Sequence, residues 1–150
     1  MDSSKELIII TGVSGAGKSS AMAFMEDAGY YCIDNMPPEL MSTFVSLLAN
    51  NSEYYPKVAM VVDIRSGYVF EKIIASIDSV EQYGYTCKIV YLDINDTEAL
   101  KRYKLTRRKH PFADKFNGNI QNALDYEREI LAPLRLKADH IIDTSSIDTH

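Results

Sequence analysis

Eight residues near the start of the chain combine glycines, a lysine and a serine in a pattern that suits phosphate binding. Residues 12–19 read GVSGAGKS and fit the pattern G-x-x-x-x-G-K-[ST]. Glycines let the backbone approach an anion closely, and successive amide groups then point inward beside the positive N-terminus of the following helix. The predicted phosphate loop consists of Gly12, Val13, Ser14, Gly15, Ala16, Gly17, Lys18 and Ser19.

A loop of this type needs a cation on the terminal phosphates and oxygen ligands for Mg²⁺. Lys18 supplies the mobile positive charge, and the Ser19 hydroxyl is the expected metal ligand. The second ligand is an acid that ends a neighbouring strand, and both Asp63 and Asp93 follow strand-like runs. We favour Asp63, because the third strand lies beside the first in kinase-like folds. Asp93 would then cap the helix that begins near Thr97.

Asp34 follows the second strand-like run, at the sheet edge where open α/β sheets gather ligand groups. There it can orient a water molecule or accept a proton from an attacking hydroxyl. A purely structural role in an Asx turn with Asn35 explains an aspartate at this position equally well.

A cluster of basic side chains occurs late in the chain, on a helix that runs into a loop. It allows three interpretations: a lid over the triphosphate, an RNA-binding patch, or a solvated helix face. Arg107 and Arg108 suit a lid, because guanidinium groups neutralise phosphoryl oxygens in the transition state. His110 is expected to pack or cap rather than to catalyse. The cluster consists of Lys101, Arg102, Lys104, Arg107, Arg108 and Lys109.

These groups must be positioned by alternating strands and helices. Apolar strand-like runs cover residues 6–11, 30–33, 58–62, 86–92 and 140–142. Helical patterns cover residues 18–28 and 97–108, and three further helices carry the apolar stripes Leu40/Phe44/Leu47/Leu48, Val69/Ile73/Ile77/Val80 and Ile120/Leu124/Leu131. This alternation predicts an α/β fold with a parallel sheet and helices on both faces. Together with the phosphate loop it indicates a kinase-like P-loop NTPase fold, in which the five strands have the order 2-3-1-4-5.

Length and composition indicate one domain over residues 1–150, since 46% of the 150 residues are hydrophobic and 25% are charged. The net charge of −5 argues against a general nucleic-acid coat. No apolar run is long enough to cross a bilayer, and the polar start does not resemble a signal peptide, so we expect a cytoplasmic protein without membrane partners.

Cys32 and Cys87 have no metal-ligand spacing and are expected to be reduced thiols. No helix follows the last strand, so the chain looks cut, and we expect bare apolar sheet surface and possible homo-oligomers.

Five segments together resemble one family, the RapZ/YvcJ P-loop nucleotide-binding proteins of bacteria. They are residues 12–19 (GVSGAGKS), 30–37 (YYCIDNMP), 63–66 (DIRS), 103–111 (YKLTRRKHP) and 127–145, with EREILAPLR and IIDTS. The segments span nearly the whole chain in the family's order.

The resemblance implies binding of ATP and GTP with Mg²⁺, and weak hydrolysis of both. It places the ATP phosphates on residues 12–19, and a guanine-nucleotide contact on Asp63, Ile64, Arg65 and Ser66. Full-length relatives carry a second, C-terminal module, which in enterobacterial relatives supports an RNase-adapter function through small regulatory RNAs. We therefore expect this chain to be the nucleotide-binding part of a two-module protein, and RNA is not its favoured partner.

Three functions compete at this point. The first is a nucleotide-binding regulatory domain with slow NTPase turnover, and the second is a small-molecule kinase, for which the sequence names no acceptor. The third is an RNA-binding module built on residues 101–109. It needs exposed aromatic side chains among the basic ones. Only Tyr103 qualifies, and its helical phase directs it inward.

Overall fold

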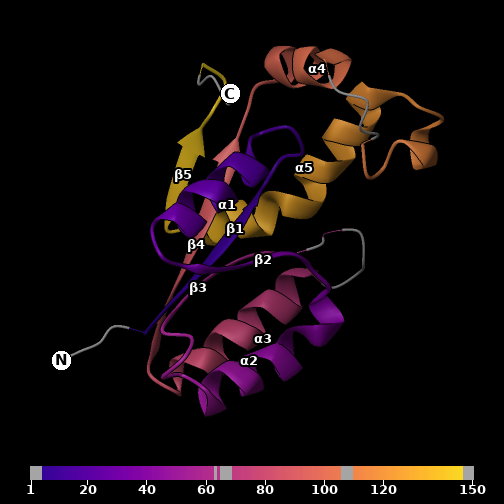
Figure 1. Cartoon of the computed structure of the whole chain (residues 1–150). Coiled ribbons are helices and arrows are strands. Elements are labelled where there is room, and N and C mark those ends of the chain that lie inside the picture. The colour runs from indigo at the N-terminus through magenta and orange to yellow at the C-terminus, as the bar shows by residue number, and fades with distance from the viewer. Residues whose placement is uncertain (1–4, 63, 65–68, 106–109, 147–150) are drawn as a thin grey trace.

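The computed structural model describes residues 5–62, 64, 69–105 and 110–146, and a parallel sheet forms its centre (Figure 1). The sheet order is β2-β3-β1-β4-β5, and every neighbouring pair is parallel. The strands are β1 Lys5–Gly12, β2 Tyr31–Met36, β3 Lys57–Val62, β4 Tyr85–Asp93 and β5 His140–Asp143. The predicted fold class and strand order are confirmed.

Helices cover both faces of this sheet. Right-handed crossovers place α1 on one face, because only the β1–α1–β2 connection runs toward the β2 edge. The other connections run the opposite way, so α2, α3 and α5 share the second face, where α3 contacts both α2 and α5. The helices are α1 Lys18–Asp27, α2 Met41–Asn50, α3 Val69–Glu81, α4 Asp96–Leu105 and α5 Ile120–Lys137, with short 3₁₀ turns at Pro38–Leu40 and Asp114–Phe116.

The core consists of the central strands and the helix faces that contact them. Leu7, Ile9 and Ile10 of β1 and Val58 and Met60 of β3 are almost completely buried. Both strands have helices on either side, so their sequences are continuously apolar rather than alternating. This rigid centre holds the carboxyl ends of β1, β3 and β4 in fixed register.

Three predicted elements differ from the structure. Of the predicted stripe, Leu48 is fully buried and Phe44 partly buried, but Leu47 of α2 and Leu40, which precedes it, are more than half exposed. Met41 and Val45 are buried instead. Strand β2 runs on to Met36 through a register irregularity after Ile33, whereas the predicted strand ended at residue 33. Helix α4 ends at Leu105 in the described part, and the rest of its predicted range lies outside the described residues.

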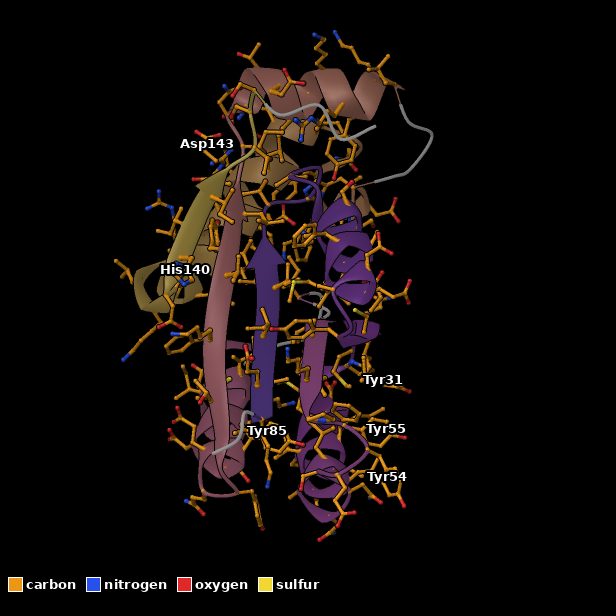
Figure 2. The ribbon with its side chains drawn as sticks, turned by 60° about the vertical axis from the view of Figure 1, so that its left-hand side comes forward. Tyr31, Tyr54, Tyr55, Tyr85, His140 and Asp143 are labelled. Carbon is orange, nitrogen blue, oxygen red and sulfur yellow. The ribbon has the colours of Figure 1, made fainter. Side chains whose placement is uncertain are left out.

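The β5 edge carries exposed apolar side chains. Ile141 and Ile142 are 46% and 43% exposed, and Figure 2 shows their strand at one edge of the sheet with Tyr31 at the opposite edge. Cys32 and Cys87 are free thiols on strands separated by two others. Among the described helices, none combines the length and the apolar character needed to cross a bilayer.

Candidate phosphate-binding site

The predicted phosphate loop connects the end of β1 to the start of α1 and lines a pocket of about 340 Å³. The pocket opens at the carboxyl ends of the strands, where open α/β sheets bind their ligands. Its walls are formed by Thr11, Gly12, Ser14, Lys18, Ser19, Asp34, Asn35, Val61, Val62, Ile64 and Pro111. Five of these residues come from the GVSGAGKS segment or the residue before it, so the loop and the pocket form one site.

The backbone of the loop requires glycine at three positions. Gly15 and Gly17 have φ values of 88° and 98°, in the left-handed region that glycine adopts without strain. Gly12 has φ 142° and lies so close to β4 that a Cβ atom would be 2.1 Å from the Leu92 carbonyl oxygen. Gly17 is also the N-cap of α1 and has no side chain, so the positive end of the helix is left open toward the pocket.

Three side chains from the last third of the chain hold three successive residues of the loop. The Glu127 carboxylate accepts hydrogen bonds from the Ser14 amide at 2.9 Å and the Ser14 hydroxyl at 2.5 Å. Arg102 donates to the Gly15 carbonyl at 2.9 Å. The Thr144 hydroxyl donates to the Ala16 carbonyl at 2.7 Å.

These bonds also connect to one another, because Arg102 donates a second hydrogen bond to the Thr144 carbonyl at 2.7 Å. The carbonyl groups of Gly15 and Ala16 are therefore engaged on the side of α4 and β5. In a nest of this type the carbonyls point outward and the amides inward, so fixing the carbonyls prepares the amides for an anion. The loop is held in shape without a bound ligand.

Lys18 lies half-buried at the mouth of the pocket, where its ammonium group donates a hydrogen bond to the Gly12 carbonyl at 2.8 Å. Burial lowers the pKa of Lys18, and the negative charges of Glu127 and Asp34 act against this shift. Phosphate oxygens are the strongest partners that such an ammonium can gain, so the geometry suits an anionic ligand.

Glu127 is fully buried, which on its own would raise its pKa. Hydrogen bonds from His110 and Ser14, with the charge of Lys18, outweigh burial and hold the pKa of this carboxyl below its usual range. The ring of His110 is also fully buried, and its Nε2 lies 3.1 Å from the carboxylate. His110 therefore packs within the fold, as predicted.

The other predicted site residues fall into two groups. Asp34 and Ile64 line the pocket with Lys18 and Ser19. Asp34 lies in the β2 irregularity, beside Asn35 with φ 59°, and its side chain is exposed. Five predicted residues lie outside the described part of the chain: Asp63, Arg65, Ser66, Arg107 and Arg108.

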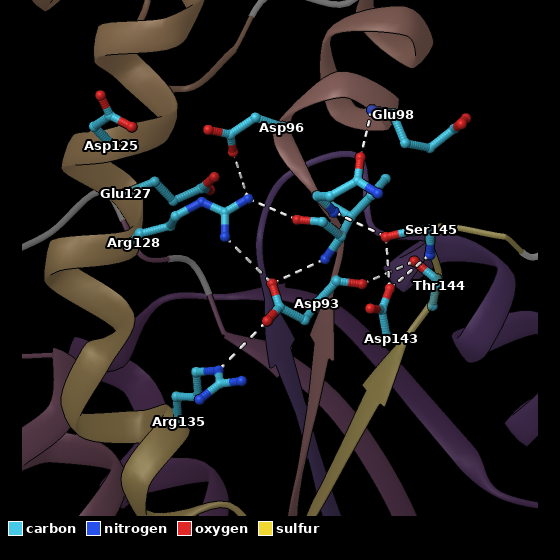
Figure 3. A network of polar contacts seen from close by, with 12 residues as sticks. Asp93, Asp96, Glu98, Asp125, Glu127, Arg128, Arg135, Asp143, Thr144 and Ser145 are labelled. Carbon is cyan, nitrogen blue, oxygen red and sulfur yellow. Dashed lines mark hydrogen bonds and ion pairs between the residues drawn. The ribbon is translucent and has the colours of Figure 1, made fainter.

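Asp93 has a different role from the helix cap predicted for it. Figure 3 shows its carboxylate between Arg128 and Arg135, both at 3.4 Å, while it also accepts from the Ile94 amide at 2.9 Å. Asn95 caps α4 instead, through a 2.8 Å bond from the Glu98 amide. Both arginines come from α5, more than thirty positions further along the chain. The sequence around Asp93 therefore does not reveal its partners.

The described residues of the basic cluster differ in how far their side chains are exposed to solvent. Lys101 and Lys104 are exposed, which fits solvated charges on a helix face. Arg102, for which no separate role was predicted, holds the loop through Gly15. The ring of Tyr103 is half-buried and lies over Gly15, 3.7 Å from the position of a Cβ atom there, so it faces inward.

Sequence reasoning missed Glu127, Arg102 and Thr144 as residues of the site. Glu127 carried a usable signal, because it falls in phase with Leu124 and Leu131 on the apolar face of its helix. An acid on a buried face requires hydrogen-bond partners. Arg102 and Thr144 carried no such signal. Within the described residues, no group of three or more His, Cys, Asp or Glu side chains is arranged to hold a metal ion.

Sequence comparison matches residues 5–150 to the family described as the RapZ-like N-terminal domain. A "Nucleotide-binding protein" of Alkaliphilus oremlandii is 45% identical over 142 residues, covering 95% of this chain and 48% of the relative. One of Finegoldia magna with the same name is 44% identical, covering 95% and 49%. The chain thus spans about half the length of these curated relatives.

Structure comparison finds the same fold in proteins of low identity. Shikimate kinase from Bacteroides thetaiotaomicron superposes with a TM-score of 0.58 at 18% identity, covering 95% of this chain and 89% of that one. The YorR protein of Bacillus subtilis, solved in complex with phosphorylated GDP, gives a TM-score of 0.55 at 16% identity, with coverage of 93% and 85%. The fold is that of P-loop kinases and NTPases, and by its sequence the chain belongs to the RapZ-like N-terminal domain family.

Proposed function

We propose that this chain binds ATP and GTP as their Mg²⁺ complexes and hydrolyses both slowly. One observation carries the proposal: a glycine loop with Lys18 at its mouth lines a pocket of about 340 Å³ at the carboxyl ends of the strands. The names of the relatives, which are nucleotide-binding proteins, support the same assignment.

In the proposed complex each group of the loop has a defined task. Amides of the loop and of the first turn of α1 bind the phosphate oxygens, and Lys18 leaves the Gly12 carbonyl for the terminal phosphates. The exposed Ser19 hydroxyl in the pocket fits an oxygen ligand of Mg²⁺, with Asp63 as the proposed second ligand. The ion, when bound with the nucleotide, neutralises charge that builds up on the phosphates.

The remaining proposed residues act around the terminal phosphate or the base. Asp34 faces the same pocket as Lys18 and would orient the attacking water. Arg107 and Arg108 would neutralise the transferring phosphoryl group, as a lid. The proposed guanine contact is the segment Asp63, Ile64, Arg65 and Ser66, of which Ile64 lines the pocket.

A titration of the four nucleoside triphosphates with Mg²⁺, followed by measurement of phosphate release, tests this proposal. We expect saturable binding of ATP and GTP, loss of affinity on chelation of Mg²⁺, and slow release of phosphate. Asp34→Asn should lower phosphate release more than affinity. A chain that binds none of the four triphosphates would contradict the proposal.

A second candidate is a small-molecule kinase, and it is favoured by the position of Asp34 in the same pocket as Lys18. This arrangement leaves room for a hydroxyl acceptor whose proton Asp34 would take. The kinase candidate predicts that labelled γ-phosphate passes to a small molecule when extract is added. Release of free phosphate alone, unaffected by extract, favours the hydrolase.

A further inference from the structure

Among the residues that the structure describes, the most deeply buried charge near the phosphate loop belongs to a residue with no proposed role in binding or hydrolysis. Glu127 of α5 has no exposed side-chain surface, and its two oxygens accept three hydrogen bonds. Two come from Ser14 in the loop, and the third involves Nε2 of His110 at 3.1 Å. Burying a carboxylate is costly unless it is fully hydrogen-bonded, as it is here.

The hydrogen bonds of His110 define the proton positions in this cluster. Nδ1 of His110 accepts a hydrogen bond from the Phe112 amide at 3.0 Å, so the ring proton must be on Nε2. A neutral His110 therefore donates to Glu127, and the ionised carboxylate meets donors only. The charge that Glu127 carries is not cancelled by His110.

We infer that Glu127 is a positioning residue of the phosphate site: its buried carboxylate fixes the loop by binding both the amide and the hydroxyl of Ser14. This inference rests on the proposed nucleotide binding for its consequence, but the tether itself belongs to the unliganded protein. Glu127 acts through the loop and does not itself touch the nucleotide.

Two substitutions separate the hydrogen bonds of Glu127 from its charge. In Glu127→Gln the amide oxygen can accept from the Ser14 amide and His110, and the NH₂ group can donate to the Ser14 hydroxyl, so the geometry is kept and the charge is lost. Glu127→Met removes both. Glu129→Gln, an exposed acid two residues further on α5, is the matched control.

The first measurement is hydrogen exchange of the Ser14 amide by NMR in the unliganded protein. Glu127→Met leaves this amide without its acceptor, so it should exchange about tenfold or more faster than in wild type, whereas Glu127→Gln and Glu129→Gln should stay close to wild type. Wild-type exchange of the Ser14 amide in Glu127→Met would overturn the tether.

The second measurement is the affinity for Mg²⁺-ATP and Mg²⁺-GTP. Glu127→Met should bind about tenfold or more weakly, the value of one hydrogen bond to a charged group, and Glu127→Gln should restore most of the affinity. Wild-type affinity in Glu127→Met, or an equal loss in Glu127→Gln and Glu127→Met, would overturn the tether to Ser14. If wild type binds no triphosphate while Ser14 exchange still rises in Glu127→Met, the proposed function fails and the tether stands.

Discussion

Gly12 lies so close to the backbone of β4 that no side chain fits there. Adding a methyl group there places a Cβ atom 2.1 Å from the Leu92 carbonyl oxygen and 2.8 Å from the Leu92 nitrogen. Both are backbone atoms of β4, the strand that pairs with β1 at this point, so the neighbour cannot rotate away. Relief requires the two central strands to separate and the bond from the Val13 amide to Leu92, 3.2 Å long, to break.

Gly12→Ala should therefore destabilise the fold by about 3–6 kcal/mol. This figure combines about 1–2 kcal/mol for a positive φ, about 1–3 for overpacking and about 1 for the lost hydrogen bond. Gly29→Ala and Gly84→Ala are matched controls, because their φ values are also positive, 95° and 90°, but nothing lies within 4 Å of the added methyl group. They should cost only the backbone strain, about 1–2 kcal/mol.

Urea unfolding followed by circular dichroism measures the difference, since the chain has no tryptophan to serve as a fluorescent probe. With a slope of about 2 kcal/mol per molar urea, Gly12→Ala should lower the midpoint by about 1.5–3 M and each control by about 0.5–1 M. Equal midpoints for Gly12→Ala and the controls would refute the close approach of β1 to β4.

Four further predictions concern individual side chains. Thr144→Val leaves the Ala16 carbonyl without its buried donor, and should cost about 1–3 kcal/mol in thermal unfolding, whereas Thr144→Ser should cost less. Burial raises the pKa of Cys87 to about 12, so alkylation at pH 8 should be far slower in folded than in unfolded protein; equal rates would contradict this. Because the unfolded thiol ionises near pH 8.5, this residue should also make stability fall between about pH 9 and 12, and Cys87→Ala should reduce that fall. Arg107→Ala or Arg108→Ala should lower NTP turnover more than NTP affinity, by about 2–4 kcal/mol in the barrier; weakened RNA binding with unchanged turnover would favour an RNA patch.

The sheet and the phosphate loop were predictable because their determinants are local. The loop is one short pattern, and alternating strands and helices predict a parallel sheet. The strand order came with the kinase-like P-loop fold that the loop indicates, and not from the alternation. The apolar pattern of α2 did not predict which of its side chains are buried. Val45 and Leu47 are both apolar and lie two positions apart, and only packing against the sheet decides that Val45 is buried.

The supports of the loop were not predictable, because they join residues far apart in the chain. Ser14 meets Glu127 across 113 positions and Ala16 meets Thr144 across 128. Glu127 and Thr144 lie in the segments EREILAPLR and IIDTS. These segments carry the resemblance to the family but do not by themselves indicate a role for either residue. Asp93 was misassigned for the same reason, since the arginines that bind it lie on α5.

Binding of a triphosphate through Lys18 is the central claim, and the melting temperature with and without nucleotide tests it most directly. At a ligand concentration one hundred times Kd, Mg²⁺-ATP or Mg²⁺-GTP should stabilise wild type by about 2.7 kcal/mol, a rise of roughly 5–10 °C. Lys18→Ala keeps the loop amides but lacks the ammonium group at the mouth of the pocket, so it should lose most of that rise. An equal rise in Lys18→Ala and wild type would place the nucleotide elsewhere on the protein.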